Sequence, residues 1–185
     1  MKKYSVICAD PPWAYKSART LQGKTSHLTA KAGQQYKTVG SKSLHDIGQH
    51  LHQVVEDDSI LFMWCTGPVL AEAIDLMAAW EYPYSQVAFV WNKVNGNPGS
   101  YTHTNCEFVL VGRRNRIPKP YKRASARQYV EIKKTGHSVK PEDFGFSIFV
   151  HRRTKQECGS QTKRCVVWQL AVRKNEILKK THYYL

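Results

Sequence analysis

The sequence predicts an α/β fold in which a parallel β-sheet carries helices on its faces. Short apolar runs alternate along the chain with segments whose apolar residues recur at helical spacing, the pattern of strands joined by crossover helices. A length of 185 residues suits one domain and is sufficient to bury a hydrophobic core. No stretch of about twenty apolar residues occurs, so we expect no membrane span.

The first half of the chain predicts two strands and one helix between them. The first strand covers about residues 4–9, and the following segment, 14–35, has almost no apolar pattern, which indicates a long loop beside the strand end. A helix capped by Ser43 follows, and Asp57-Asp58-Ser59 is expected to close it before a buried strand at 60–65. The apolar face of this helix is Leu44, Ile47, Leu51, Val54 and Val55.

The elements after residue 65 continue the same alternation. Pro68 opens a second helix, followed by strands at 86–92 and 107–112 with a polar loop at 95–105 between them. The predicted apolar face of this helix is Leu70, Ala73, Ile74, Met77 and Ala78. Residues 113–127 hold seven Arg/Lys and two Pro, which indicates an exposed loop, and 128–132 is one more candidate strand.

Positive charge is concentrated in the second part of the chain. Residues 1–112 hold nine Lys/Arg and nine Asp/Glu, whereas residues 113–185 hold nineteen and five, so the net charge of +14 resides there. This asymmetry favours a polyanionic partner, and nucleic acid is the leading interpretation. A solvated basic tail without a specific partner is the alternative.

The five cysteines form no C-x-x-C pair and are odd in number. We therefore expect reduced thiols and a cytoplasmic location, without a disulfide or zinc framework. No metal site is predicted either, because His50 and His52 are two residues apart on a helix and face different ways. Gly23, Gly33 and Gly40 do not form a phosphate-binding fingerprint.

The most informative segment is Asp10-Pro11-Pro12-Trp13 at the end of the first strand. Two prolines fix φ at successive positions and remove two N–H donors, so the carbonyl oxygens of the turn are free acceptors. Asp10 adds a side-chain acceptor, and Trp13 offers a ring for stacking. Such a turn suits an exocyclic amine on a flat base, although a strand followed by a proline turn also occurs without any such function.

This tetrad and five further segments resemble the MT-A70 family of S-adenosylmethionine-dependent N6-adenine methyltransferases, in its phage and bacterial type. The resemblance covers about residues 4–144 and follows the order of the family. Its further segments are Tyr36-Lys37-Thr38, Leu61-Phe62-Met63-Trp64-Cys65-Thr66, Val90-Trp91-Asn92-Lys93, Cys106-Glu107-Phe108-Val109-Leu110-Val111-Gly112 and His137-Ser138-Val139-Lys140-Pro141-Glu142.

The resemblance implies a Rossmann-like class I methyltransferase sheet with helices on both faces. It implies a methyltransferase domain over residues 1–150, followed by a basic, atypical tail over 151–185. The implied catalytic residues are Asp10, Pro11, Pro12 and Trp13. Residues implied to contact the cofactor, S-adenosylmethionine, are Asp10, Cys8, Lys140 and Ser138. Those implied to contact the substrate are Trp13, Tyr15, Tyr36 and Glu107, although Glu107 could equally cap a sheet edge. Tyr101, His103 and Asn105, in the loop before Glu107, are further candidate substrate contacts.

Two features of the tail depart from the family. The chain has only Pro141-Glu142-Asp143-Phe144 where the family has a helix of about four turns, and no Gly-Trp or Gly-Asn segment follows. In the family these parts hold the ribose and adenine of the cofactor, so we expect an incomplete cofactor pocket.

The leading hypothesis is therefore an adenine-N6 methyltransferase that acts on DNA, with RNA as the near alternative. A catalytically impaired homologue that binds nucleic acid or serves as a partner subunit is the reading from a different class. The intact Asp10-Pro11-Pro12-Trp13 favours the enzyme, and the missing tail segments favour the impaired homologue. A homodimer is left open as the oligomeric state.

Overall fold

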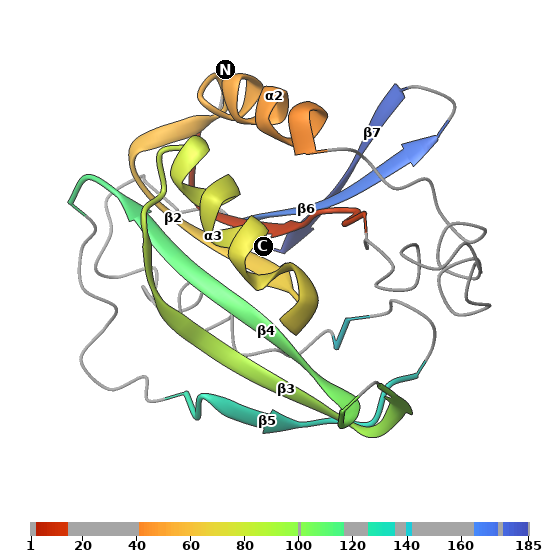
Figure 1. Cartoon of the computed structure of the whole chain (residues 1–185). Coiled ribbons are helices and arrows are strands. Elements are labelled where there is room, and N and C mark those ends of the chain that lie inside the picture. The colour runs from red at the N-terminus through yellow and green to blue at the C-terminus, as the bar shows by residue number, and fades with distance from the viewer. Residues whose placement is uncertain are drawn as a thin grey trace.

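The computed structural model describes residues 3–14, 41–99, 101–116, 126–135, 140–141, 165–173 and 176–184. Figure 1 shows their arrangement as one sheet with two helices in front of it. In chain order the elements are β1 (Tyr4–Asp10), α2 (Ser41–Leu51), β2 (Val55–Cys65), the 3-10 turn η2 (Gly67–Val69), α3 (Leu70–Ala79), β3 (Tyr84–Pro98), β4 (His103–Arg114), β5 (Tyr129–Glu131), β6 (Cys165–Arg173) and β7 (Glu176–Tyr184).

The described strands form one seven-stranded sheet in the order β5-β3-β4-β2-β1-β6-β7. β1 is parallel to β2 and β6, and β3 is parallel to β5, but β4 is antiparallel to both β2 and β3. The expected parallel sheet is therefore a mixed sheet. The cause is the short connection after β3, since a parallel crossover needs a dozen or more residues and here the N–H of Gly99 bonds to the carbonyl of Thr102 at 3.0 Å to form a hairpin.

The strand predictions are confirmed, with different limits. β3 and β4 extend beyond the predicted 86–92 and 107–112 because they continue as a hairpin through the segment that was expected to be a loop. Asp57-Asp58-Ser59 belongs to β2 and does not close the preceding helix, which ends at Leu51. The tail range 151–185 contributes β6 and β7 to the same sheet, next to β1.

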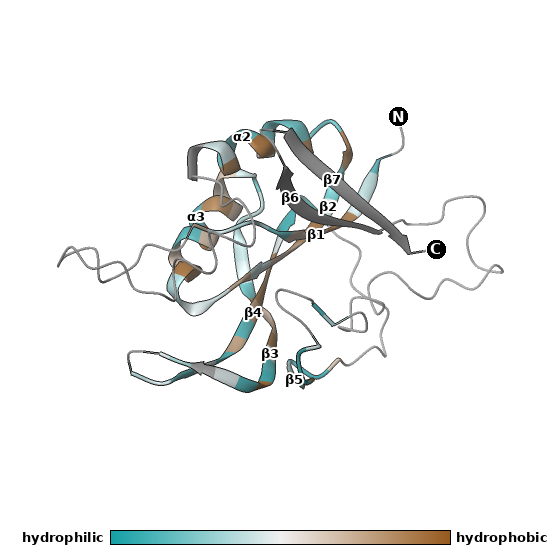
Figure 2. Ribbon diagram, turned by 90° about the vertical axis from the view of Figure 1, so that its right-hand side faces the viewer, coloured by the Kyte–Doolittle hydropathy of each residue, from teal (hydrophilic) through white to brown (hydrophobic). Residues whose placement is uncertain are grey.

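Both described helices lie on one face of the sheet. Their apolar residues pack against alternate residues of the central strands, among them Ile7, Leu61 and Met63. The helices expected on the other face are not found among the described residues. Figure 2 shows hydrophobic residues concentrated in the helices and the central strands.

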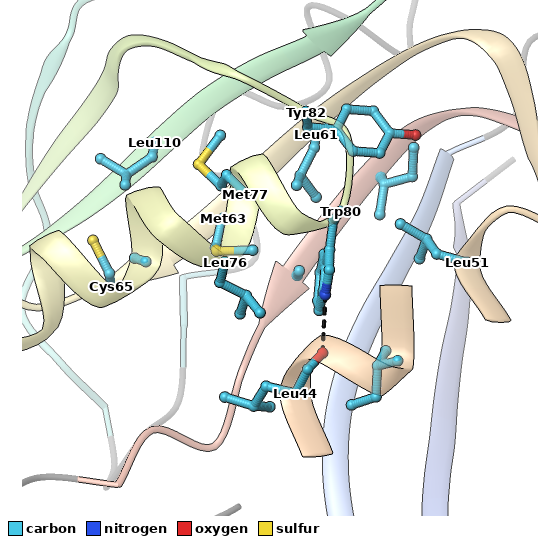
Figure 3. Close-up of a cluster of buried hydrophobic side chains, with 14 of the residues drawn as sticks. Leu44, Leu51, Leu61, Met63, Cys65, Leu76, Met77, Trp80, Tyr82 and Leu110 are labelled. Carbon is cyan, nitrogen blue, oxygen red and sulfur yellow. Dashed lines mark hydrogen bonds between the residues drawn. The ribbon is translucent and has the colours of Figure 1, made fainter. Parts of the chain in front are cut away.

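The core between the helices and the sheet includes two polar contacts of large aromatic residues. The indole N–H of Trp80 donates to the carbonyl of Leu44 at 2.9 Å, which ties the end of α3 to α2 (Figure 3). The hydroxyls of Ser59 and Tyr82 share a hydrogen bond of 2.6 Å. These bonds satisfy polar groups that would otherwise be buried at a cost.

Two details of the helix predictions are wrong. Ser43 lies inside α2, which begins at Ser41, and so is not its cap. On α3 the buried residues are Ala73, Leu76 and Met77, whereas Ala78 is exposed. The other predicted residues of this face, Leu70, Ala73, Ile74 and Met77, all pack in the core, and Leu76 is the buried residue of α3 that the prediction omits.

A second apolar cluster lies on the opposite face of the sheet. It is formed by alternate residues of four strands: Val6, Cys8, Phe62, Trp64, Phe89, Trp91, Val109 and Val111. All eight are buried. Among the described residues, no helix is both long enough and apolar enough to cross a membrane.

Candidate active site

The candidate site lies where the second apolar cluster meets the carboxyl ends of β1 and β2. Alternate residues of a strand share one face of a sheet. Asp10 therefore continues the row of Val6 and Cys8 on β1, and Lys93 continues the row of Phe89 and Trp91 on β3. On the antiparallel β4, Glu107 continues the row of Val111 and Val109. The alternation alone brings three charged side chains to one end of an apolar face.

Lys140 joins these residues into a chain of alternating charges. Its Nζ lies 3.3 Å from Oδ2 of Asp10 and 3.1 Å from Oε2 of Glu107. The other carboxylate oxygen of Glu107 lies 3.2 Å from Nζ of Lys93. We call Asp10, Lys93, Glu107 and Lys140 the ionic cluster. Two cations and two anions give it a formal charge of zero.

The ionic cluster is largely withdrawn from water. The side chains are 15% to 23% exposed. Burial raises the pKa of Asp10 above the ordinary 3.8; the ammonium of Lys140 opposes this rise, and the carboxylate of Glu107 adds to it. Burial alone would lower the pKa of Lys140, but the carboxylates of Asp10 and Glu107 raise it above its ordinary value. Lys140 is therefore a permanent cation at neutral pH.

The ring of Trp64 packs against the ammonium group of Lys140. The ammonium lies 5.2 Å from the centroid of the Trp64 ring, within the range of a cation–π interaction. Trp91 meets Trp64 edge to face, with ring centroids 5.9 Å apart and an interplanar angle of 80°. Trp64 lies on β2 and Trp91 on β3, with β4 between them, so Trp91 reaches across β4 to pack against the ring that Lys140 contacts.

The proline turn after β1 is rigid and buried. The N–H of Trp13 donates to the carbonyl of Pro11 at 2.9 Å, and Pro11 and Pro12 are both buried. The indole N–H of Trp13 donates to the carbonyl of Trp64 at 2.9 Å, and the side chain is 4% exposed. This structure therefore gives Trp13 no open ring face for a base. The predicted stacking role is not supported, and Trp13 instead fastens the turn to β2.

The remaining predicted residues divide into buried, exposed and undescribed positions. Cys8 is 2% exposed within the second apolar cluster, and its implied contact with the cofactor stays a prediction. Tyr101 is 99% exposed at the tip of the β3–β4 hairpin. Tyr15, Tyr36 and Ser138 lie outside the described residues, and their implied contacts stay predictions.

Lys93 and Trp64 are site residues to which the sequence motifs assign no role. Both belong to segments that resemble the family, at the end of an apolar strand. The signal that finds them is the two-residue period, which places Lys93 on the same face as Trp91 and next to Glu107 across the β3–β4 pair. The sequence is equally compatible with Glu107 as a substrate contact and as a sheet cap; in the structure Glu107 bridges Lys93 and Lys140.

Asn92 organises the outer side of the same strand. Its side-chain amide donates to the hydroxyl of Tyr129 at 2.7 Å and to Oε2 of Glu131 at 2.9 Å. Its oxygen accepts the N–H of Val94 at 2.9 Å and the side-chain amide of Asn105 at 3.1 Å. One side chain thus joins β3, β4 and β5 immediately before Lys93.

Cys65 borders the site from the helix side of the sheet. It follows Trp64 on β2 and is 2% exposed. Burial raises the pKa of its thiol to about 12, and the charge of Glu107 adds to the rise. The described residues contain no group of three His, Cys, Asp or Glu side chains that could hold a metal ion.

The chemistry of the site follows from its charges. Carboxylates beside lysines can bind a zwitterion, with its ammonium toward Asp10 or Glu107 and its carboxylate toward Lys140 or Lys93. The carboxylate of Asp10, at the end of a rigid turn, can also accept a hydrogen bond from an amine. The arrangement therefore suits an amino-acid-like ligand beside an amine-bearing substrate.

Two comparisons with known proteins show what this chain is similar to. A sequence model of the family MT-A70 matches residues 4–158. A Type II methyltransferase, M.MunI of a Mycoplasma species, is 40% identical over 150 residues. The alignment covers 76% of this chain and 64% of that protein, so the chain spans less than two-thirds of the length of this relative.

Proposed function

This chain belongs to the MT-A70 family, and on that premise we propose that it transfers a methyl group from S-adenosylmethionine to N6 of adenine in DNA. The observation that carries the proposal is the contact of Lys140 with both Asp10 and Glu107. These residues lie as much as 130 positions apart in the sequence. They belong to three of the segments through which the sequence resembles the family.

The ionic cluster fits the amino-acid end of S-adenosylmethionine. That end carries an ammonium and a carboxylate, for which the cluster offers two carboxylates and two ammonium groups. Lys140 and Asp10 would hold these groups, as the family resemblance implies. When bound, S-adenosylmethionine supplies a methyl group whose C–S bond breaks, with its electron pair left on sulfur, as the amine nitrogen bonds to carbon.

Asp10 has the central role in orienting the amine. Its ionised carboxylate accepts a hydrogen bond from the N6 amine and so aims the nitrogen lone pair at the methyl carbon. The carbonyl of Pro11 already accepts the N–H of Trp13, but a carbonyl oxygen has two lone pairs and can accept a second donor. The proton released by the methylated amine passes to Asp10 or to water.

Duplex DNA is the proposed substrate because the similar M.MunI is named a Type II methyltransferase. An adenine in a duplex must leave the base stack before its amine can reach Asp10. RNA presents the same base, and only contacts to its 2′-hydroxyl groups would differ.

The test is methyl transfer from labelled S-adenosylmethionine to matched DNA and RNA duplexes, followed by nucleoside analysis. We expect N6-methyladenine in the DNA product with the wild-type chain and a rate about 10²–10³ times lower with Asp10→Ala. Methylation of another base, or transfer by Asp10→Ala at the wild-type rate, would contradict the proposal. Sedimentation of the same preparation shows whether the chain forms the homodimer that the sequence leaves open.

A further inference from the structure

The neutrality of the ionic cluster raises the question of which residues attract a polyanionic substrate to the site. Lys93 and Lys140 are both paired with carboxylates, so neither offers an unpaired charge to a phosphate. We propose that Lys133 and Lys134, which follow β5, form the phosphate-binding surface that holds the substrate polynucleotide beside the site. This inference rests on the proposed function.

The backbone around β5 places these two lysines at the edge of the sheet where the site lies. β5 pairs in parallel with β3, and Glu131 lies opposite Asn92 (Figure 1). The N–H of Ile132 donates to the carbonyl of Asn92 at 3.1 Å, and the indole N–H of Trp91 donates to the carbonyl of Ile132 at 2.7 Å. Ile132, the residue before Lys133, is thus hydrogen-bonded through both its N–H and its carbonyl to the β3 segment that leads into Lys93.

Lys133 and Lys134 are exposed, and no ion pair joins them to an acid in the described part of the chain. Glu131 is the nearest acid in the sequence, and its carboxylate accepts hydrogen bonds from Asn92 and Tyr129. Arg127, at the other end of β5, is also exposed. The net charge of this edge is therefore positive even with Glu131 ionised.

The distance to the site fits a single duplex footprint. Lys134 is six residues from Lys140, and six residues span at most roughly 20 Å. Successive base pairs of B-DNA are about 3.4 Å apart, so the two lysines reach phosphates within about six base pairs of the target adenine. A duplex anchored there would still present its adenine to Asp10.

The chain provides a matched control at the other end of the sheet. Arg113 and Arg116 are also exposed, belong to the same basic part of the sequence and carry the same charge. Arg113 lies opposite Ile60 in the middle of β2 and six residues from Glu107 along β4, or roughly 20 Å at 3.4 Å per residue. By the two-residue period Arg113 shares a face with Glu107, but Ile60 pairs with Val6, so phosphates held at Arg113 would lie at the opposite end of β1 from Asp10.

The experiment compares K133A/K134A with R113A/R116A in the full chain, using a 20-base-pair DNA duplex that contains adenine and the RNA duplex of the same sequence. For K133A/K134A we expect Kd at 50 mM salt to rise at least roughly tenfold, and the slope of log K against log salt to fall by about two. In methyl transfer, KM for the duplex should rise while kcat stays the same. R113A/R116A should change none of these values.

The outcomes separate this inference from the proposed function. Wild-type affinity and slope in K133A/K134A, or an equal loss in both double variants, would overturn the phosphate-binding surface while leaving methyl transfer as it stands. If the wild-type chain methylates nothing and K133A/K134A alone loses DNA binding, the phosphate-binding surface is supported and the proposed function is contradicted. A loss seen with RNA and not with DNA would overturn the assignment of DNA as the polynucleotide held there.

Discussion

Asp10 is the residue on which the proposed chemistry depends most directly. Replacing it by Ala removes an acceptor whose hydrogen bond to the amine is made during transfer, and loss of one such contact typically costs about 10²–10³ in kcat. We expect Asp10→Ala to lose methyl transfer by that factor and to keep the wild-type Kd for DNA, because its phosphate contacts lie elsewhere. Single-turnover assays and binding titrations on the same protein provide the two measurements.

The pKa of Asp10 predicts the acid limit of the reaction. Only the ionised carboxylate can accept the amine hydrogen, so activity should fall as the pH drops through a pKa that burial holds above 3.8. Glu107→Gln removes an anion and should move this limit to lower pH. Lys140→Met removes a cation and should raise the pKa of Asp10.

The two substitutions should shift the pKa of Asp10 in opposite directions, and a carboxyl NMR titration of Asp10 measures both shifts without an activity assay. Because the raised pKa favours protonated Asp10 in the folded chain, the contribution of Asp10 to stability is present below the unfolded pKa and is lost as the pH rises through the folded pKa. Shifts of the same direction in both variants would contradict the described contacts.

At the scale of residues, sequence motifs found the acidic and basic partners better than the aromatic ones. Asp10, Glu107 and Lys140 were singled out from the sequence, and the structure brings them together. Trp13 is buried in the structure, because an aromatic ring after a proline turn can pack inward as readily as outward, and its stacking role stays a prediction. Lys93 was missed because its importance comes from a strand pairing that no local motif contains.

The contact between α2 and the end of α3 gives a prediction at the scale of elements. A Cβ added at Gly48 would lie 2.4 Å from Cδ1 of Trp80, whose ring is fully buried and bonded to Leu44. Because the Trp80 ring cannot move away from the added methyl group without disturbing its packing and its hydrogen bond, Gly48→Ala should lower the free energy of unfolding by roughly 1–3 kcal/mol.

Gly67 is the matched control for this change. An added Cβ at Gly67 meets nothing within 4 Å, so Gly67→Ala should leave the urea unfolding midpoint close to the wild-type value. Equal midpoints for the two variants would show that α2 and α3 do not pack as closely as described.

The elements themselves were largely predictable, but their relation in the sheet was not. Apolar periodicity located the strands and both helices, because each buries one face. The antiparallel direction of β4 depends on how 95–105 connects two strands, and a polar segment is equally compatible with a hairpin and with an open loop. The position of both helices on one face is likewise a consequence of the strand order.

At the scale of the whole molecule, the distribution of charge predicts that salt affects the binding of the two ligands of the proposed reaction differently. The ionic cluster sums to zero, whereas the chain carries +14. We expect duplex affinity to fall steeply between 50 and 200 mM salt, as release of counterions requires, and affinity for S-adenosylmethionine to change little. Calorimetry of both ligands at the two salt concentrations checks the contrast, which a similar salt dependence for both would refute.

The same calorimetry tests the incomplete cofactor pocket predicted from the sequence. The segments that hold ribose and adenine in the family have no counterpart after Phe144, so binding of S-adenosylmethionine is expected to be weak. Tight stoichiometric binding would contradict this expectation and would show that other residues of the chain complete the pocket.

The buried thiol of Cys65 has a consequence for a protein that handles an alkylating agent. A thiolate is a far better nucleophile than an aromatic amine, so an ionised cysteine near the reactive methyl would be consumed by self-alkylation. With its pKa raised to about 12, Cys65 keeps its proton at any physiological pH and is inert. Mass spectrometry after long incubation with labelled S-adenosylmethionine should find no methyl group on Cys65, and the acceptor amine then has no competitor at this position.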